Sequence, residues 1–210
     1  MNIKLICFDL DQTLINHSSW KELGFALGIS YEEDKRLYEE YKSGLVTYDE
    51  WNKKILNLYL KHKDANKEEI TKIFSRYSYN KGAREAIKYL KNKGYVLVLI
   101  SGSIDILVDM VAKDLGIKFS KSNNTFIFDN QNRIKDIISN GDDTYSKMFY
   151  LNDFCGKLKL NLQDCACVGD GANDIEMFRQ TKHGITFKGS IIENEAWKVI
   201  ESLEDLKNIF

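Results

Sequence analysis

Hydrophobic residues follow two different patterns along this chain of 210 residues. A short apolar run from Ile3 to Phe8, rich in β-forming residues, predicts a buried strand at the start. From about residue 16 to residue 79 the pattern is helical, with no sign of a strand. From Lys81 onward, short apolar runs alternate with amphipathic stretches, which indicates strands alternating with helices.

Four helix-start signals recur within the helical block. Each places a capping residue three positions before a glutamate, which is the spacing of a capping box or a close relative of it. The pairs are Ser19 and Glu22, Ser30 and Glu33, Thr47 and Glu50, and Asn66 and Glu69. Gly28 and Gly44 are expected to end the first two helices.

The remainder of the chain predicts a parallel sheet. Strands are expected at 95–100, 165–168 and 183–187, with a hairpin formed by 125–129 and 133–137. Helices are expected at 82–93, at 104–115, at 144–154 ending at Gly156, and in the C-terminal remainder, which also contains a candidate edge strand. This alternation predicts an α/β fold, a Rossmann-like parallel sheet with helices on both faces.

The helical block interrupts this α/β pattern and divides the chain. We expect a core formed by residues 1–15 and 80–210, and an inserted small all-helical cap domain formed by residues 16–79. Because the insertion directly follows the loop after the first strand, the cap is expected to lie over the carboxyl end of the sheet like a lid.

Composition and charge exclude several classes of protein. With 30 basic and 31 acidic residues the formal net charge is −1, so no large basic field exists to hold nucleic acid or an anionic membrane. The chain shows no apolar run of membrane-spanning length, and because Met1 to Lys4 lead directly into the first strand we expect no signal peptide. The spacing of Cys7, Cys155, Cys165 and Cys167 is not that of a zinc site, so we expect buried reduced thiols. These features predict a cytoplasmic protein.

Acidic side chains follow two of the predicted strands, at the sheet edge where ligands bind in α/β folds. Asp9 and Asp11 follow the first strand, and Asp170 and Asp174 follow the strand at 165–168. Four converging carboxylates carry too much negative charge to remain without a cation, and an all-oxygen set suits Mg²⁺. Taken alone, the loop that carries Asp9 and Asp11 could equally be a loop that only caps the next helix.

A second group of residues is suited to hold an anion beside these acids. Ser101, Gly102 and Ser103 follow the strand at 95–100 and offer hydroxyl and N–H donors at a helix start. Lys147, near the start of another helix, could neutralise a second side of the same anion. Taken singly, Ser101 could be only a helix cap and Lys147 only a solvated residue. Together with the acids, they are the parts needed for phosphoryl transfer.

These motifs make the chain resemble the haloacid dehalogenase-like superfamily, most closely its phosphoserine phosphatase-like subfamily. The segment Asp9-Leu10-Asp11-Gln12-Thr13 matches the first family motif, Ser101 the second and Lys147 the third. The segment Gly169-Asp170-Gly171-Ala172-Asn173-Asp174 matches the fourth motif in its full subfamily form. The resemblance runs nearly from end to end, with the helical block in the place of the family's small cap domain.

The resemblance implies a Mg²⁺-dependent phosphatase that acts through an aspartyl-phosphate. Asp9 would be the nucleophile, and Asp11 would protonate the leaving oxygen and then activate water. The metal would be held by Asp9, the backbone carbonyl of Asp11, and Asp170. The other motif residues would bind the phosphoryl group, namely Ser101, Gly102, Lys147 and Asn173, or support the site, namely Thr13 and Asp174.

The cap would select the substrate, a small phosphate ester for which phosphoserine is one candidate. Ser18 stands where phosphoserine phosphatases carry a glutamate, and the stretch around Lys53 has lysines where they carry an arginine. Trp20, Tyr48 and Trp51 would form either an aromatic wall for a larger ester or part of the helix-packing core.

Two other functions stay open for this sequence. One is phosphoryl transfer to an alcohol acceptor, and the other, from a different class, is a non-catalytic binding protein on the same fold. We expect no nucleic-acid or membrane partner, and a monomer or a homodimer.

Overall fold

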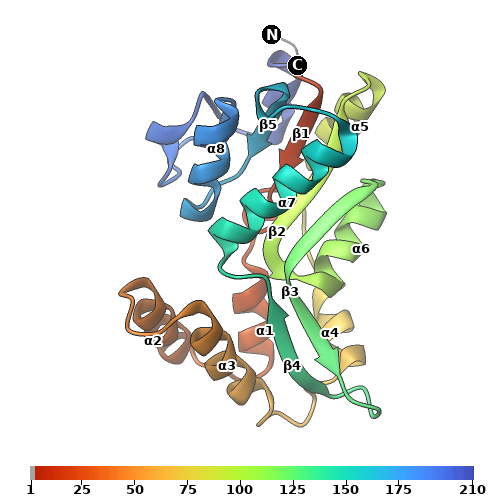
Figure 1. Cartoon of the computed structure of the whole chain (residues 1–210). Helices are drawn as coiled ribbons and strands as arrows, with labels where there is room; N and C mark the ends of the chain where they lie inside the picture. The colour runs from red at the N-terminus through yellow and green to blue at the C-terminus, as the bar shows by residue number, and fades with distance from the viewer. Residues whose placement is uncertain (1–2) are drawn as a thin grey trace.

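The computed structural model describes residues 3–210, so the first two residues of the predicted core segment lie outside the described part. Seven strands form one sheet in the order β4-β3-β2-β1-β5-β6-β7, and every neighbouring pair is parallel except β3 and β4. The strands are β1 Leu5–Phe8, β2 Val96–Ile104, β3 Phe119–Phe128, β4 Ile134–Ser139, β5 Cys165–Val168, β6 Gly184–Phe187 and β7 Lys198–Ile200. The predicted α/β fold is confirmed (Figure 1).

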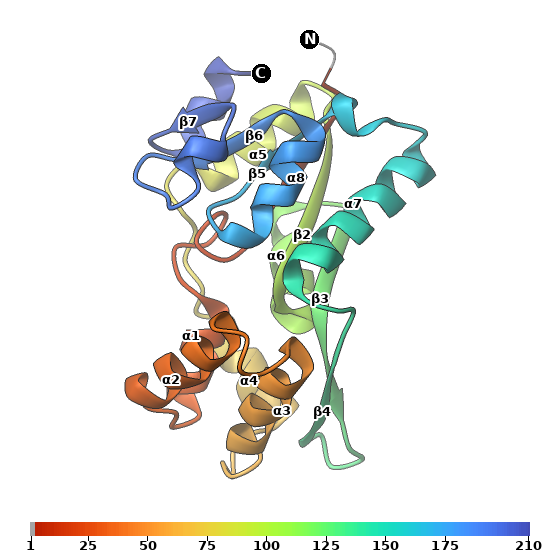
Figure 2. The same ribbon diagram turned by 60° about the vertical axis from the view of Figure 1, so that its left-hand side comes forward.

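Eight α-helices accompany the sheet within residues 3–210. They are α1 Ser19–Ala26, α2 Tyr31–Lys42, α3 Tyr48–Tyr59, α4 Lys67–Phe74, α5 Ala83–Asn92, α6 Asp105–Leu115, α7 Asp143–Leu158 and α8 Ile175–Thr181. Helices α1–α4 gather at one end of the molecule, and the β3–β4 hairpin extends into the same region (Figures 1 and 2). Strand β4 packs there against α3, so the sheet itself reaches the inserted helices.

Hydrophobic side chains alternate between the two faces of the sheet, as the geometry of a strand requires. On one face, Leu5 and Cys7 of β1 belong to a buried cluster to which α7 and α8 contribute. On the other face, Ile6 and Phe8 join the larger cluster that includes residues of α5 and α6. Burial on both faces explains why these strands read as continuous apolar runs in the sequence.

Three of the four predicted helix-start signals form caps in the structure. Their capping residues are Ser30, Thr47 and Asn66, and each side chain accepts a hydrogen bond from the backbone N–H three residues later. The prediction at Ser19 was wrong, because Ser19 is the first residue of α1 and the N-cap is Ser18, which makes no side-chain cap. Instead of capping the helix, the Ser19 hydroxyl donates a hydrogen bond to Asp11 in the loop after β1.

Strand β2 is longer than the sequence predicts. The expected loop at residues 101–103 belongs to β2, which continues past it with a shift in register. The cause is β3, whose polar first half gives no strand signal but pairs with this segment. The Ser122 hydroxyl donates to the Ser103 carbonyl oxygen at 2.6 Å, and the Asn124 amide donates to the Gly102 carbonyl oxygen at 2.7 Å. Polar side chains of β3 thus satisfy backbone acceptors in the irregular part of β2.

Two expectations for the last third of the chain need correction. Helix α7 continues through Gly156 and ends at Leu158, because the residue that adopts the left-handed conformation is Lys159. The C-terminal remainder contains short 3-10 turns and the edge strand β7 instead of α-helices. Its apolar residues, such as Leu203 and Leu206, are buried against the sheet side that carries α5.

The four cysteines are buried free thiols, as the sequence predicted. Cys155 of α7 and Cys165 of β5 lie side by side, with 3.4 Å between their sulfur atoms. Among residues 3–210, no helix combines the length and the apolar character that crossing a bilayer requires.

We expect Gly184→Ala to destabilise the fold, because a Cβ at this position of β6 would overlap the ring of Phe178 in α8. Overpacking of this kind costs about 1–3 kcal/mol. Gly156→Ala is the matched control, since a Cβ there meets nothing within 4 Å and replaces a helical glycine. It should stabilise the protein by about 0.5–1 kcal/mol. Urea unfolding measures both variants, and equal stability would contradict this packing of α8 on β6.

Candidate active site

The carboxyl ends of β1 and β5 bring two acidic loops together at one edge of the sheet. These strands are direct neighbours, with Phe8 paired to Val168. The Asp9 N–H donates to the Val168 carbonyl oxygen at 2.9 Å, which fixes the start of the first loop. One carboxylate oxygen from each of Asp9, Asp170 and Asp174 lies within 4.8 Å of the other two. The structure therefore brings together acids that are more than 150 residues apart in the chain.

Lys147 is the cation at the centre of this cluster. Its side chain on α7 is fully buried, and its ammonium lies 2.9 Å from Asp9 Oδ1 and 2.7 Å from Asp174 Oδ1. Burial acts to lower the pKa of Lys147, but the charges of Asp174 and Asp9 outweigh burial and raise that pKa. Burial raises the pKa of Asp9, and the charge of Lys147 opposes this shift. Lys147 is thus a permanently charged bridge between the two acidic loops.

Asp11 lies in a different environment from Asp9. Burial raises the pKa of its carboxyl to about 7, although hydrogen bonds from Ser19 act to lower it. Ser19 donates to Asp11 Oδ2 from its hydroxyl at 2.6 Å and from its backbone N–H at 3.2 Å. Among residues 3–210, the buried Asp11 Oδ1 has no hydrogen-bond partner. A carboxyl with a pKa near neutrality is able both to donate a proton and to accept one.

Hydrogen bonds hold the loop after β5 in place. The Thr13 hydroxyl donates to Asp170 Oδ1 at 3.2 Å and so joins the two acidic loops. Asp174 Oδ2 accepts from the Gly171 N–H at 3.2 Å, while its other oxygen faces Lys147. Asn173 is half-buried and folds back over Gly171. Thr13 and Asp174 therefore position their neighbours, and Asn173 lies in the same loop as the acids.

The donor set of this cluster fits a divalent cation. Asp9 Oδ2 and Asp170 Oδ2 receive no hydrogen bond from another residue in the described part of the chain, whereas both oxygens of Asp174 are engaged. Burial, with the charge of Asp174, raises the pKa of Asp170 to about 6. The only ammonium within ion-pair distance of these acids in residues 3–210 is that of Lys147. Oxygen ligands in excess of their positive partners suit Mg²⁺.

Ser101 and Gly102 lie on β2, the neighbour of β1 on the other side from β5. The Ser101 side chain is buried, and its oxygen accepts from the Ser103 N–H at 3.1 Å, which leaves the hydroxyl proton available to a ligand. Gly102 has no room for a side chain, because the carboxylate of Asp143 packs against it. Ser101 and Gly102 therefore lie on a strand and not at the helix start that the sequence predicted, since α6 begins at Asp105.

The four predicted cap residues differ in where the structure places them. Trp20 of α1 reaches the core, where its Nε1–H donates to the Gly102 carbonyl oxygen at 3.0 Å. Trp51 of α3 packs on Trp20 with 5.7 Å between ring centroids. Ser18 is half-buried just before α1, and Lys53 is exposed on α3. Trp20 thus reaches β2 and Trp51 packs behind it, whereas Lys53 lies on the surface.

Three further residues contact the site and were not predicted from the sequence, namely Ser19, Asn80 and Asp143. Asn80, where the chain returns from α4 to the core, donates its amide to the carbonyl oxygens of Gln12 and Thr13 at 3.0 and 2.9 Å. Nothing local marks Ser19 and Asn80, because their partners lie in other segments. Asp143 had a usable signal, because it lies one helical turn before Lys147 and so on the same face of α7.

Comparisons with known proteins agree with this geometry. A family model described as haloacid dehalogenase-like hydrolase matches residues 3–181. A phosphoserine phosphatase of Methanocaldococcus jannaschii is 32% identical over 206 residues, which cover 98% of this chain and 95% of that protein. A phosphoserine phosphatase of Streptococcus thermophilus is 27% identical over 214 residues, which cover 96% of each protein.

Solved structures match over the same length. One, a phospho-aspartyl intermediate analogue of phosphoserine phosphatase, has a TM-score of 0.82 at 32% identity and covers 99% of both chains. A substrate-bound phosphoserine phosphatase complex has a TM-score of 0.82 at 31% identity, covering 100% of this chain and 97% of that chain. The similarity therefore includes helices α1–α4 as well as the sheet.

We expect Lys147→Met to destabilise the protein by about 3–5 kcal/mol at mildly alkaline pH, because it leaves buried carboxylates without their cation. The pKa of Asp9 is raised by burial, and the variant removes the charge that opposes this shift. When folding raises the pKa of an acid, the contribution of that acid to stability is fully present at pH values below its pKa in the unfolded chain. This contribution is lost as the pH rises through its pKa in the folded protein. The loss in Lys147→Met should therefore be smaller at mildly acidic pH.

Urea unfolding at the two pH values measures this effect. The control is Lys157→Met, which removes an exposed pair with Asp153 on the same helix. It should change stability by no more than about 0.5 kcal/mol. If the two variants lost the same stability, the bridging role of Lys147 would be wrong.

Proposed function

The chain belongs to the haloacid dehalogenase-like hydrolase family, and we propose that it hydrolyses a small phosphate monoester through an aspartyl-phosphate on Asp9. One observation carries this proposal. Asp9 is ion-paired with Lys147, whose charge opposes the rise in pKa that burial causes, whereas Asp11 forms no ion pair within residues 3–210 and burial raises its pKa to about 7. Neighbouring carboxyls with different environments are suited to be nucleophile and general acid.

We propose that Asp9, the backbone carbonyl of Asp11, and Asp170 hold a Mg²⁺ ion. The free oxygens of Asp9 and Asp170 support this assignment, as does the engagement of both Asp174 oxygens elsewhere. When bound, the ion neutralises negative charge on the phosphoryl group during transfer. Asp174 has a positioning role, since it holds Lys147 and the Gly171 backbone.

In the first step, the Asp9 carboxylate attacks phosphorus and the bond from phosphorus to the ester oxygen breaks. Asp11 gives its proton to that oxygen, so the alcohol leaves neutral. Lys147, Ser101, the Gly102 N–H and Asn173 hold the phosphoryl oxygens. Lys147 is already charged and fixed beside Asp9, so its electrostatic contribution needs no rearrangement during the reaction.

In the second step, Asp11 acts as a base and takes a proton from a water molecule that attacks phosphorus. The bond from phosphorus to the Asp9 oxygen breaks, and inorganic phosphate leaves. Lys147 favours this departure, because it stabilises the negative charge that returns to Asp9. Asp11 is protonated again at the end of the cycle.

Residues 1–15 and 80–210 form the catalytic core in this proposal, and residues 16–79 form the cap. The core supplies the acids, Lys147 and Ser101, and the cap supplies Ser19 and Trp20, which hydrogen-bond to the core, and Trp51, which packs on Trp20. Phosphoserine is the first substrate to test, because relatives are named phosphoserine phosphatases. We place the enzyme in the cytoplasm, which the buried free thiols support.

Phosphate release with and without Mg²⁺ tests the function. The substrates are para-nitrophenyl phosphate, phosphoserine and a panel of metabolite phosphates, each with and without an added alcohol. Metal-dependent release of phosphate supports hydrolysis. Transfer of the phosphoryl group to the alcohol in preference to water would support a phosphotransferase instead, and no turnover of any ester would overturn the proposal.

We expect Asp9→Asn to lower turnover by about 10⁴-fold or more, because the amide oxygen is a poor nucleophile. The fold should persist, since Asn has the same size and still accepts a hydrogen bond from Lys147. Phosphate release and circular dichroism measure the two effects. Asp153→Asn, which changes an exposed acid on α7, is the control and should keep full activity. An active Asp9→Asn protein would show that the nucleophile is a different group.

We expect kcat/KM for an alkyl phosphate to fall as the pH rises through about 7, because Asp11 must be protonated to act as the acid. Ser19→Ala removes a hydrogen bond that lowers the pKa of Asp11, so the fall should move to higher pH. The pH profile of kcat/KM measures this shift, with the exposed Ser43→Ala as control. If both variants kept the wild-type pH profile of kcat/KM, the hydrogen bond from Ser19 would have no effect on the pKa of Asp11.

A further inference from the structure

Five residues form a closed circle of contacts between the inserted helices and the core. The Trp20 Nε1–H donates to the Gly102 carbonyl oxygen at 3.0 Å, and the centroids of Trp20 and Trp51 are 5.7 Å apart. Trp51 packs on Tyr48 with 5.6 Å between centroids, and the Tyr48 hydroxyl donates to Asp143 Oδ1 at 2.8 Å. Asp143 packs back against Gly102 and closes the circle. We name these five residues the aromatic–acid ring.

The aromatic members of the ring are only partly used for packing. Trp20 and Trp51 are half-buried, and so is Tyr41, which stacks on Trp51 with 5.6 Å between centroids. Each of them packs against its neighbours and still keeps some of its surface accessible. Trp20 lies directly beside Gly102, the neighbour of Ser101 on β2, so a ligand bound there would meet the accessible part of these aromatic side chains.

Asp143 is a carboxylate without a cation. Its Oδ1 accepts from the Tyr48 hydroxyl and from the Asn123 amide, both at 2.8 Å. In residues 3–210, its Oδ2 receives no hydrogen bond from another residue, and no lysine or arginine forms an ion pair with it. Lys147, one turn further along α7, is committed to the acids of the site. A mostly buried acid in this state favours a positively charged ligand.

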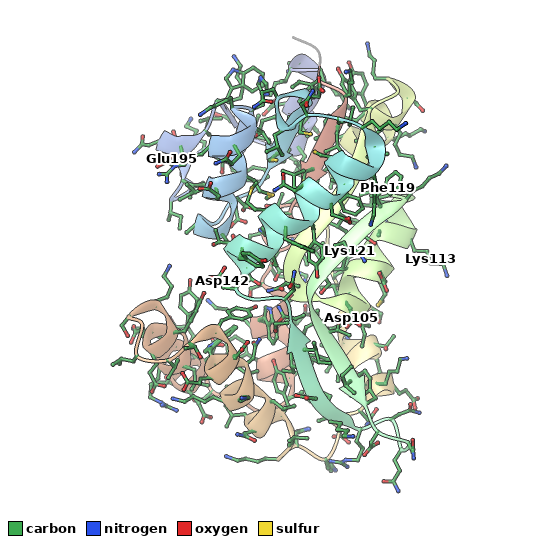
Figure 3. The ribbon with its side chains drawn as sticks, in the orientation of Figure 1. Asp105, Lys113, Phe119, Lys121, Asp142 and Glu195 are labelled. Atoms are coloured by element: carbon green, nitrogen blue, oxygen red, sulfur yellow. The ribbon has the colours of Figure 1, made fainter. Side chains whose placement is uncertain are left out.

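Apart from Lys147, the charged groups that act on Asp143 and Tyr41 at the ring are acids. Asp142, at the N-terminal end of α7 in Figure 3, adds a second acid where the core meets the inserted helices. Burial, with the charges of Asp142 and Asp143, raises the pKa of Tyr41 to about 12. The nearest candidate cations on α3 are occupied or remote, since Lys54 pairs with Glu40 and Lys53 is exposed. Within residues 3–210, no lysine or arginine forms a hydrogen bond or an ion pair with a member of the ring, which disfavours a carboxylate on the substrate.

We propose that the aromatic–acid ring binds a positively charged leaving group, so that the substrate is the phosphate ester of an amino alcohol without a carboxylate. The ammonium lies against the faces of Trp20 and Trp51 and is neutralised by Asp143. The phosphoryl group lies on the other side of Gly102, next to the ion pair of Lys147 and Asp9. This assignment rests on the proposed phosphatase function and adds the substrate class.

The test compares esters that differ only in charge. Phosphocholine is paired with 3,3-dimethylbutyl phosphate, its neutral isostere, and phosphoethanolamine is paired with propyl phosphate. We expect kcat/KM to favour the cationic ester by at least about tenfold in one pair. Equal rates within both pairs overturn the proposal, and so does a preference for phosphoserine over both amino alcohol esters.

Asp143→Asn separates recognition from structure, because it keeps the size and the hydrogen-bond acceptor of the side chain. We expect the ratio of kcat/KM between the cationic and the neutral ester to fall to near one, and Asp143→Glu to restore part of it. Asp153→Asn, on the same helix, should leave the ratio unchanged. If Asp143→Asn lowers kcat/KM equally for the cationic and the neutral ester, the role of Asp143 is structural and the proposal is wrong.

A binding measurement keeps this test independent of turnover. The chain has three tryptophans, so in a Trp197→Phe background only Trp20 and Trp51 report by fluorescence. We expect choline to saturate the signal at a concentration at least about tenfold lower than 3,3-dimethylbutanol. Absence of this difference overturns the ring proposal. If the protein hydrolyses para-nitrophenyl phosphate but does not prefer choline, only the ring proposal is wrong. If it binds choline but hydrolyses no ester, only the proposed phosphatase function is wrong.

Discussion

The ion bridge that Lys147 makes between Asp9 and Asp174 is the interaction on which the site depends. Neither acid could stay buried and charged without this cation, so the bridge ties the loops after β1 and β5 to α7. Helix α7 is held in turn by Leu151 and Phe154 in the hydrophobic cluster under the sheet. The apolar packing of Leu151 and Phe154 thus fixes α7 so that the Lys147 ammonium lies within hydrogen-bond distance of the two acids.

The same helix carries two opposite charges one turn apart, and each has a separate task. Lys147 faces the acids that would meet the phosphoryl group, and Asp143 accepts a hydrogen bond from Tyr48 of α3. Burial leaves Asp143 and Asp170 with raised pKa values, so both are less stable as anions than they would be in water. Such uncompensated acids lower stability but prepare the site for positively charged partners.

The acids at strand ends were predictable because a buried strand followed by Asp9 or Asp170 is a local pattern. The irregular end of β2 was not, because residues 101–103 join a strand only through the polar side chains of β3. Ser19 has the spacing of a helix cap, yet its hydroxyl contacts Asp11 and Ser103, which are 8 and 84 residues away. Periodicity describes neighbours along the chain and contains no information about such distant acceptors.

The contact between Ser19 and Asp11 also couples two equilibria. Its donors lie on α1, so any movement of α1 away from the sheet removes them from Asp11. These hydrogen bonds favour the ionised acid, and by reciprocity the ionised acid favours the docked helix with the same free energy. Each proton that Asp11 gains or loses therefore changes how tightly α1 is held against the sheet.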